Sequence, residues 1–391
     1  MTPAARVAAA IAVLDAVIAA ARSGGAPADR LLADWFRTRR FAGSKDRRAV
    51  RELVYAAIRA CGPVPVTGRA ALLRLAAGDA AMAALFDGEG YAPAPIASGE
   101  PVAEGGIAPA WLAERLAGSD VAGAEAKALL DRAPLDVRIN PLRGDGLPDL
   151  PLCGEPTAAP GALRFPAGTP VESWDAYTAG RIEVQDSGSQ LACQAVGAQP
   201  GETVIDLCAG AGGKTLALAA TMQDRGRLIA ADTDRGRLSN LPPRAERAGA
   251  SIIETRLLDP DREAAAMADL AGQADAVLVD APCSGTGTWR RNPEARWRLT
   301  PALLARYTAV QARLLDIAAA LVAPGGRLVF ITCSLLDEEG ADQVAAFLAR
   351  HPQWRAAPPA LGAGTPRGEG IRLTPGTDGT DGFFIARIDR P

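Results

Sequence analysis

The stretch VIDLCAGAGGKT, residues 204–215, decides the fold class. An apolar run ends in an acid, a glycine-rich turn follows, and an alanine- and leucine-rich segment begins at Lys214. This order is typical of a strand, a tight turn and a helix start, because glycine lets the backbone approach a ligand at a helix N-terminus. Strand and helix patterns alternate onward, with strands expected near 203–207, 227–231, 252–256, 276–280, 326–332 and 382–387. We therefore predict an α/β fold with a mostly parallel sheet and helices on both faces.

The glycine turn fails both common phosphate-binding patterns. A Walker A loop needs glycine where Cys208 stands, and the dinucleotide fingerprint needs its third glycine where Thr215 stands. The remaining pattern suits a nucleoside ligand without a pyrophosphate, such as S-adenosylmethionine, although an ordinary strand-to-helix turn is the simpler alternative. Asp232 ends the second strand, where a carboxylate can accept both ribose hydroxyls. Asp259 is a candidate for the adenine edge, with Asp261 as a close competitor and a solvated loop acid as the other interpretation.

Two cysteines also follow predicted strands. Cys283 lies in the segment DAPCS, residues 280–284, and Cys333 lies in TCS, residues 332–334. The carboxyl ends of parallel strands share one edge, where open α/β sheets bind ligands. Two thiols there suit methylation of a pyrimidine carbon 5, in which a thiolate adds to carbon 6 and a second group assists elimination. Asp280 is placed to hold the pyrimidine near N3 and N4, although either cysteine alone could be a small buried residue.

Composition narrows the chemistry further. His351 is the only histidine among 391 residues, and the six cysteines include no Cys-x-x-Cys pair, so we expect no metal, no Cys-His pair and no disulfide framework. The chain is 48% hydrophobic and 22% charged, as a globular protein is. We expect a cytoplasmic monomer without a membrane partner, because Asp15 interrupts the apolar run and no signal-peptide layout is evident. The net charge of −3 implies that any basic surface is local.

The motifs around both cysteines resemble one known family. DAPCSGTG at 280–287, RRNPEARW at 290–297, TCS at 332–334 and TDGFF at 380–384 are similar to the RNA cytosine-5 methyltransferases of the RsmB/NOP/Sun superfamily. This resemblance covers residues 130–391 and implies a class I methyltransferase fold, Rossmann-like, with a mostly parallel seven-stranded sheet. Ala211 in place of the family's proline, and Gly340-Ala341 after Glu338-Glu339, depart from the family pattern.

The resemblance also implies roles for individual residues. It makes Cys333 the nucleophile, Cys283 the residue that assists product release, and S-adenosylmethionine the cofactor. The cofactor contacts that it implies are Cys208, Ala209, Gly210, Ala211, Gly212, Gly213, Lys214, Asp232, Asp259 and Asp280.

Basic and aromatic residues near these motifs suggest RNA contacts, since arginine binds phosphate and aromatic rings stack on bases. The alternatives are a solvated loop for 290–298 and a strand edge with a helix cap for 138–143 and 185–187. The candidates are Arg138, Asn140, Arg290, Arg291, Asn292 and Arg298.

Four regions follow from the pattern: a helical domain at 1–87, a linker at 88–108 rich in Gly, Ala and Pro, a small α+β RNA-binding subdomain at 109–200, and the catalytic domain at 201–391. SKDRR at 44–48 and ELVY at 52–55 resemble the NusB-like domain that precedes this module in bacterial small-subunit rRNA enzymes, although a plain packing bundle is the alternative. The expected activity is methylation of cytosine carbon 5 in 16S rRNA. The alternatives are a tRNA cytosine-5 enzyme and a non-catalytic RNA-binding or ribosome-assembly factor, and a non-catalytic factor would need neither cysteine.

Overall fold

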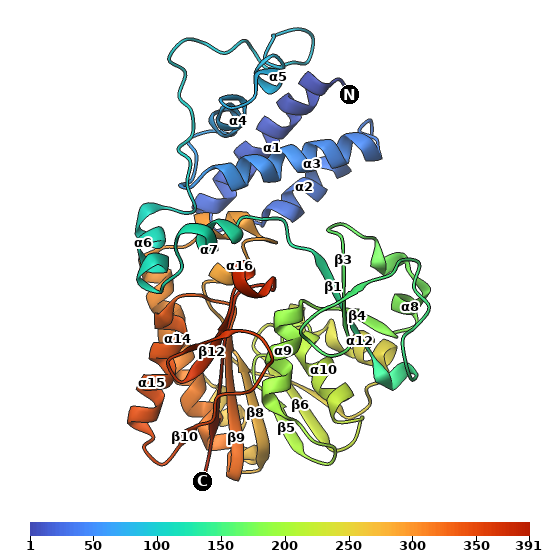
Figure 1. Ribbon diagram of the computed structural model, residues 1–391, viewed down its shortest axis with the longest axis vertical. Coiled ribbons are helices and arrows are strands. Elements are labelled where there is room, and N and C mark those ends of the chain that lie inside the picture. Colours follow the sequence, from blue (N-terminus) through green and yellow to red (C-terminus); the bar gives the residue numbers. More distant parts are fainter. The chain divides into compact units, whose positions relative to one another are not determined.

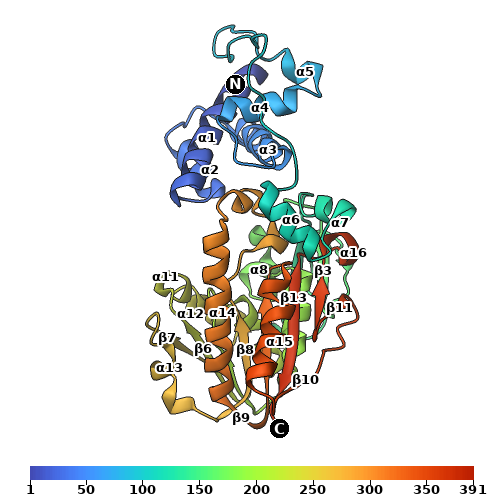
Figure 2. The ribbon, with the colours of Figure 1, turned by 90° about the vertical axis from the view of Figure 1, so that its left-hand side faces the viewer.

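The computed structural model describes residues 1–391 and divides into two compact units. The first combines residues 1–131 with 288–300, and the second combines 132–287 with 301–391. These units differ from the predicted domain bounds, because residues 109–131 and 288–300 group with the helical part of the chain. Each unit is described by itself below, and both are drawn in Figures 1 and 2.

The first unit is all-helical, as predicted for its N-terminal part. Its helix α1 packs against α2, α3 and α4 around a core that includes Val13, Leu14 and Val54. The helices are α1 Pro3–Ser23, α2 Ala28–Arg37, α3 Ser44–Ala60, α4 Gly68–Ala76, α5 Ala80–Ala83, α6 Ala110–Gly118 and α7 Gly123–Ala128.

Helix α1 is the central element of this unit. Thr2 caps its N-terminus, Pro3 opens it, and Gly24 ends it in the left-handed conformation, with φ at 71°. By length and hydropathy alone, α1 could cross a membrane even though Asp15 interrupts its apolar run. Its apolar side is instead buried in the core of the unit. Asp15, which interrupts the apolar run, accepts a hydrogen bond of 2.6 Å from the backbone N–H of Gly68 at the start of α4.

The second unit begins with a small antiparallel sheet. Its strand order is β2-β3-β1-β4, formed by β1 Leu135–Ile139, β2 Glu155–Pro156, β3 Ala162–Phe165 and β4 Ile182–Val184, with α8 Asp175–Thr178 before β4. Helix α9, Ser187–Val196, then leads into the large sheet.

The large sheet has nine strands in the order β11-β12-β13-β9-β8-β5-β6-β7, with β10 paired to β13. Strands β5 to β9 are mutually parallel, and the remaining strands are antiparallel. The sheet thus has two strands more than the seven predicted, namely the short β10 and β11, which lack a strong apolar run. The strands are β5 Thr203–Asp206, β6 Arg227–Asp232, β7 Ile253–Leu257, β8 Ala274–Asp280, β9 Val322–Thr332, β10 Arg355–Ala356, β11 Thr365–Arg367, β12 Gly370–Leu373 and β13 Phe383–Asp389.

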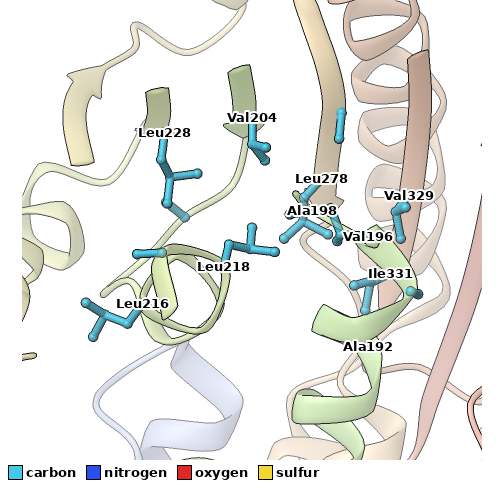
Figure 3. Close-up of a cluster of buried hydrophobic side chains, with 14 of the residues drawn as sticks. Ala192, Val196, Ala198, Val204, Leu216, Leu218, Leu228, Leu278, Val329 and Ile331 are labelled. Atoms are coloured by element: carbon cyan, nitrogen blue, oxygen red, sulfur yellow. The ribbon is translucent and has the colours of Figure 1, made fainter. Parts of the chain in front are cut away.

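Side chains alternate between the two faces of this sheet, as the period of two in a strand requires. Val204, Leu228 and Leu278 face α9 and α10 (Figure 3), whereas Ile205 and Val277 belong to the core on the other face. The helices covering the faces are α10 Gly213–Thr221, α11 Arg235–Leu238, α12 Leu241–Ala248, α13 Glu263–Ala266, α14 Pro301–Leu321 and α15 Ala341–Arg350, with α16 Pro375–Asp378 between β12 and β13.

Candidate active site at the sheet edge

The structure brings the two motif cysteines together. Strands β8 and β9 are parallel neighbours, with Asp280 opposite Ile331, so the loops that follow them leave the same edge of the sheet. The Sγ atoms of Cys283 and Cys333 lie 3.4 Å apart, and both side chains are half-buried. The hydrogen bond to Cys333, followed by burial, raises the pKa of the Cys283 thiol well above its ordinary value. Cys283 therefore holds its proton at neutral pH.

Asp280 is anchored by Lys214. The Nζ atom of Lys214, in the first turn of α10, lies 2.7 Å from Asp280 Oδ2 and 5.6 Å from the centroid of the Phe383 ring. Burial opposes the charge on Lys214, but the Asp280 carboxylate raises the pKa of the ammonium above its ordinary value. The nearby sulfurs of Cys193 and Cys333 also raise this pKa, so the Lys214 cation lies near Cys333. The sequence analysis assigned Lys214 to the cofactor alone.

The glycine turn follows β5, leads into α10 and is hydrogen-bonded to Asp232 at the end of β6. Gly210 and Gly212 have φ of 55° and 84°, conformations that favour glycine, and a Cβ on Gly212 would lie 2.1 Å from a methyl carbon of Leu241. Gly210 donates its backbone N–H to Asp232 Oδ2 at 2.6 Å, while Asp234 donates to the other oxygen at 2.7 Å. Ala211, which replaces the family's proline, accepts a hydrogen bond from Arg244 through its carbonyl.

Asp206 is a buried acid that the sequence did not single out. Its Oδ2 accepts a hydrogen bond of 2.7 Å from Thr215 Oγ1, and its other oxygen has no partner. Burial, together with the nearby charges of Asp280 and Asp232, raises the pKa of Asp206 to about 7. Carboxylates from three strand ends therefore gather at this edge. Its position at a strand end, just before the glycine turn, was the signal available in the sequence.

Cys208, predicted as a cofactor contact, is half-buried in the same turn. Burial, followed by the charge of Asp206, raises the pKa of its thiol well above the ordinary value.

Asp259 is exposed after β7, next to Leu258, whose N–H donates to the Asp232 carbonyl at 2.9 Å. Its competitor Asp261 instead forms an ion pair with Arg313.

A buried carboxylate connects the two cysteine loops. Glu339 has no exposed surface and accepts hydrogen bonds from the Ser284 N–H at 2.9 Å, from the Ser284 hydroxyl, and from Gln311 Nε2 at 3.1 Å. The Ser284 hydroxyl lies 3.1 Å from that of Ser334, which adjoins Cys333. Burial raises the pKa of Glu339, while the bonds from Ser284, Ser334 and Gln311 act in the opposite direction. Glu339 belongs to the segment Glu338-Glu339, after which Gly340-Ala341 departs from the family pattern.

The segment 288–300 packs into the helical unit. Arg296 has no exposed surface and donates to the carbonyls of Ile58, at 2.6 Å, and Cys61, at 2.8 Å. Trp297 donates to the Gly62 carbonyl at 3.1 Å. These residues thus stabilise the end of α3, which the RNA-side interpretation of the motif did not anticipate.

The same structure divides the RNA candidates. Arg290 is buried, and Arg298 donates to the carbonyls of Gly25 and Ala26 at 2.7 Å, so neither side chain is the exposed surface group that the predicted RNA contact needs. Arg291 and Asn292 are exposed and stay predicted RNA contacts.

The predicted RNA contact of Asn140 is also inconsistent with the structure. It is 2% exposed, and its amide donates at 2.8 Å to the carbonyls of Gly180 and Ala248. Asn140 therefore joins β1 to two loops and is not available to RNA. Arg138 is also buried, but its surroundings differ and are described below.

The sheet order, the glycine turn after its first parallel strand and the acids at the strand ends define a class I methyltransferase. The family model described as "16S rRNA methyltransferase RsmB/F" matches residues 193–389. The chain belongs to this family.

Curated relatives carry matching names. "Ribosomal RNA small subunit methyltransferase B" of Xylella fastidiosa is 36% identical, over 72% of this chain and 68% of the relative. The protein of the same name from Citrobacter koseri is 33% identical, over 72% and 66%. "Probable ribosomal RNA small subunit methyltransferase B" of Synechocystis is 35% identical over 66% of this chain, which spans only 60% of that relative's length.

Solved structures share the fold. A methyltransferase homologue from Pyrococcus horikoshii is 26% identical, with a TM-score of 0.56, over 68% of this chain and 90% of its own. NSun6 from the same organism, solved with the S-adenosylmethionine analogue SFG, has a TM-score of 0.59 and 20% identity over 72% of this chain and 97% of its own.

Proposed function

We propose that this protein methylates carbon 5 of a cytosine in 16S rRNA, in the bacterial cytoplasm, with S-adenosylmethionine as methyl donor. The observation that carries the proposal is the pair of thiols 3.4 Å apart at the ends of adjacent parallel strands. A binding scaffold needs neither thiol, whereas covalent activation of a pyrimidine needs a nucleophile and a second group beside it. The names of the relatives favour small-subunit rRNA as the substrate.

The residues of the glycine turn fit S-adenosylmethionine. The carboxyl groups of Asp232 and Asp280 lie beside the turn, as a cationic ligand prefers, and Lys214 pairs with Asp280 alone. Asp232 retains unused lone pairs on both oxygens for ribose hydroxyls, and Gly210 and Gly212 permit close approach of the ligand. When bound, the cofactor supplies the electrophilic methyl group that carbon 5 accepts.

Cys333 attacks first in this mechanism. Its sulfur, near the Lys214 ammonium, forms a bond to carbon 6 of the cytosine as the thiolate, and carbon 5 becomes nucleophilic. Asp280, held by Lys214, orients the base from its N3 and N4 edge. The target base must be unstacked to reach these groups, which costs a few kcal/mol and favours an unpaired loop.

Cys283 completes the cycle. Before attack, Cys283 is protonated and can donate to the sulfur of Cys333. The hydrogen bond to Cys333, which contributes most to the raised pKa of Cys283, is weakened once the Cys333 sulfur is bonded to carbon 6. Cys283 then assists removal of the carbon 5 proton, the bond between sulfur and carbon 6 breaks, and the Cys333 thiolate is regenerated.

Bisulfite sequencing of total RNA from cells with and without this protein tests the proposal. We expect one cytosine of 16S rRNA to lose its protection from conversion when the protein is absent. If protection were lost only at a cytosine of tRNA, or at no cytosine of any RNA, the proposed substrate would be contradicted.

A further inference from the structure

A cavity of about 550 Å³ lies in the second unit, away from the cysteine pair. Strand β1, helix α9 and helix α10 surround it, and the loop 144–147 borders it. The walls are mostly apolar, with a few polar groups, which is the usual composition of a small-molecule site of this size. The apolar wall residues are Ile139, Pro141, Leu147, Pro160, Ala217 and Ala220.

Arg138 provides the charge in this cavity. The side chain is 8% exposed, and its Nε donates to Gln185 Oε1 at 2.9 Å. No carboxylate forms an ion pair with Arg138, and its two terminal nitrogens have no protein acceptor. Burial lowers the pKa of the guanidinium, as expected for a desolvated charge without a counterion. A buried charge of this kind normally has a partner.

The neighbouring acids already have other partners. Asp136, two residues earlier on β1, binds Arg164 at 2.8 Å, and Glu183 on β4 binds Arg244 and Arg247. Asp145 is the only carboxylate residue lining the cavity, and it is exposed on the bordering loop. The fold therefore leaves the positive charge of Arg138 for a ligand.

Hydrogen bonds hold Arg138 in place. Gln185 donates through Nε2 to Ser189 Oγ at 3.2 Å and to Cys193 Sγ at 3.6 Å, which fixes the oxygen that receives Arg138. Gln190, 3% exposed, donates to the Gln185 carbonyl at 2.9 Å, and its own Oε1 lacks a donor. The guanidinium is thus oriented before any ligand arrives, which lowers the entropic cost of binding.

We propose that this cavity binds a single nucleotide, with the phosphate on the Arg138 guanidinium and the base against the apolar wall. A planar fork of donors suits a phosphate, and an apolar wall suits the faces of a base. The nucleotide comes either free from solution or as a splayed residue of the RNA. The second source rests on the proposed function, whereas the first does not.

Calorimetric titration of the full-length protein with cytidine monophosphate, with S-adenosylhomocysteine present throughout, tests the cavity. Arg138→Met should weaken binding by at least about tenfold, since a charge-assisted contact is lost. Arg225→Met, which removes an exposed arginine elsewhere, is the matched control and should bind as wild type. Gln194→Trp fills the cavity from an exposed position on α9, keeps Arg138, and should also block binding.

Competition separates the two sources. If a short single-stranded RNA displaces the nucleotide from wild type at low salt, but not at 1 M salt, where phosphate contacts are screened, the RNA is the source. Nucleotide binding without displacement by the RNA indicates the free ligand. Cys333→Ala should bind the nucleotide normally, so loss of methylation and loss of this site are distinguishable. No binding by wild type, or binding by Arg138→Met and Gln194→Trp with the affinity of wild type, would overturn the proposal.

Discussion

Cys283 and Cys333 approach to 3.4 Å between sulfur atoms although fifty residues separate them in the chain. Adjacent parallel strands bring them together, and Glu339 holds the serines next to them. The two thiols lie in different surroundings, because the hydrogen bond to Cys333 and burial raise the pKa of Cys283, whereas Cys333 lies near the Lys214 ammonium. The predictions below test this arrangement and the residues that support it.

Cys333→Ala should reduce methyl transfer below detection and leave cofactor binding within about twofold of wild type. The reason is that the substitution removes the attacking sulfur, while the glycine turn and Asp232 lie on other strands. Transfer of labelled methyl groups to rRNA and calorimetric titration with S-adenosylmethionine provide the two readouts. Normal turnover by this variant would show that another group attacks the base.

Glu339→Ala should lower the rate of methylation by at least about tenfold and destabilise the second unit by about 1–3 kcal/mol, because it leaves the buried Ser284 and Gln311 donors unpaired. Glu338→Ala, at the neighbouring and less buried position, is the control for stability and rate. Rescue of the rate by Glu339→Gln would indicate positioning through hydrogen bonds. Equal effects of the alanine substitutions at 338 and 339 would contradict the role given to Glu339.

Asp206 should make stability depend on pH. Its folded-state pKa of about 7 exceeds the ordinary 3.8, so its contribution is fully present below pH 3.8 and is lost as the pH rises to about 7. Asp206→Asn should remove this slope, with a difference of at most about 4 kcal/mol between the ends of the window. Urea unfolding of both proteins from pH 4 to pH 8 measures it. Parallel pH profiles for the two proteins would refute the raised pKa.

Arg296→Met should destabilise the helical unit by at least about 2 kcal/mol, because the Ile58 and Cys61 carbonyls lose their buried donor. Arg291→Met, in the same segment but exposed, should change stability by less than about 0.5 kcal/mol. Scanning calorimetry of the whole protein compares the unfolding transitions. A larger loss from Arg291→Met would mean that the segment does not support this unit.

The sequence predicted the elements of the sheet well, because strands β5, β6, β8 and β9 have strong apolar runs of the expected length. Cys283 and Cys333 could be placed at one edge for the same reason: parallel strands end together. The partners of Arg296 and Glu339 could not be predicted, since each pairs with residues distant in sequence. Local periodicity carries no information about such pairing.

The motif RRNPEARW illustrates this limit. The arginines in and just after this motif suggested RNA contacts from composition, yet Arg290 is buried, and Arg296 and Arg298 donate to backbone carbonyls of the helical unit. Whether an arginine faces solvent or a row of backbone carbonyls depends on tertiary packing. Exposure of Arg291 and Asn292 likewise emerges only from the structure.

The most direct test of the central claim is the fate of Cys283→Ala with RNA and S-adenosylmethionine, examined on a denaturing gel. Without Cys283 to assist elimination, Cys333 should stay bonded to carbon 6, and the account predicts a protein–RNA adduct that survives denaturation. The double variant Cys283→Ala, Cys333→Ala should form none. An adduct with Cys333→Ala, and none with Cys283→Ala, would contradict the account by reversing the two roles.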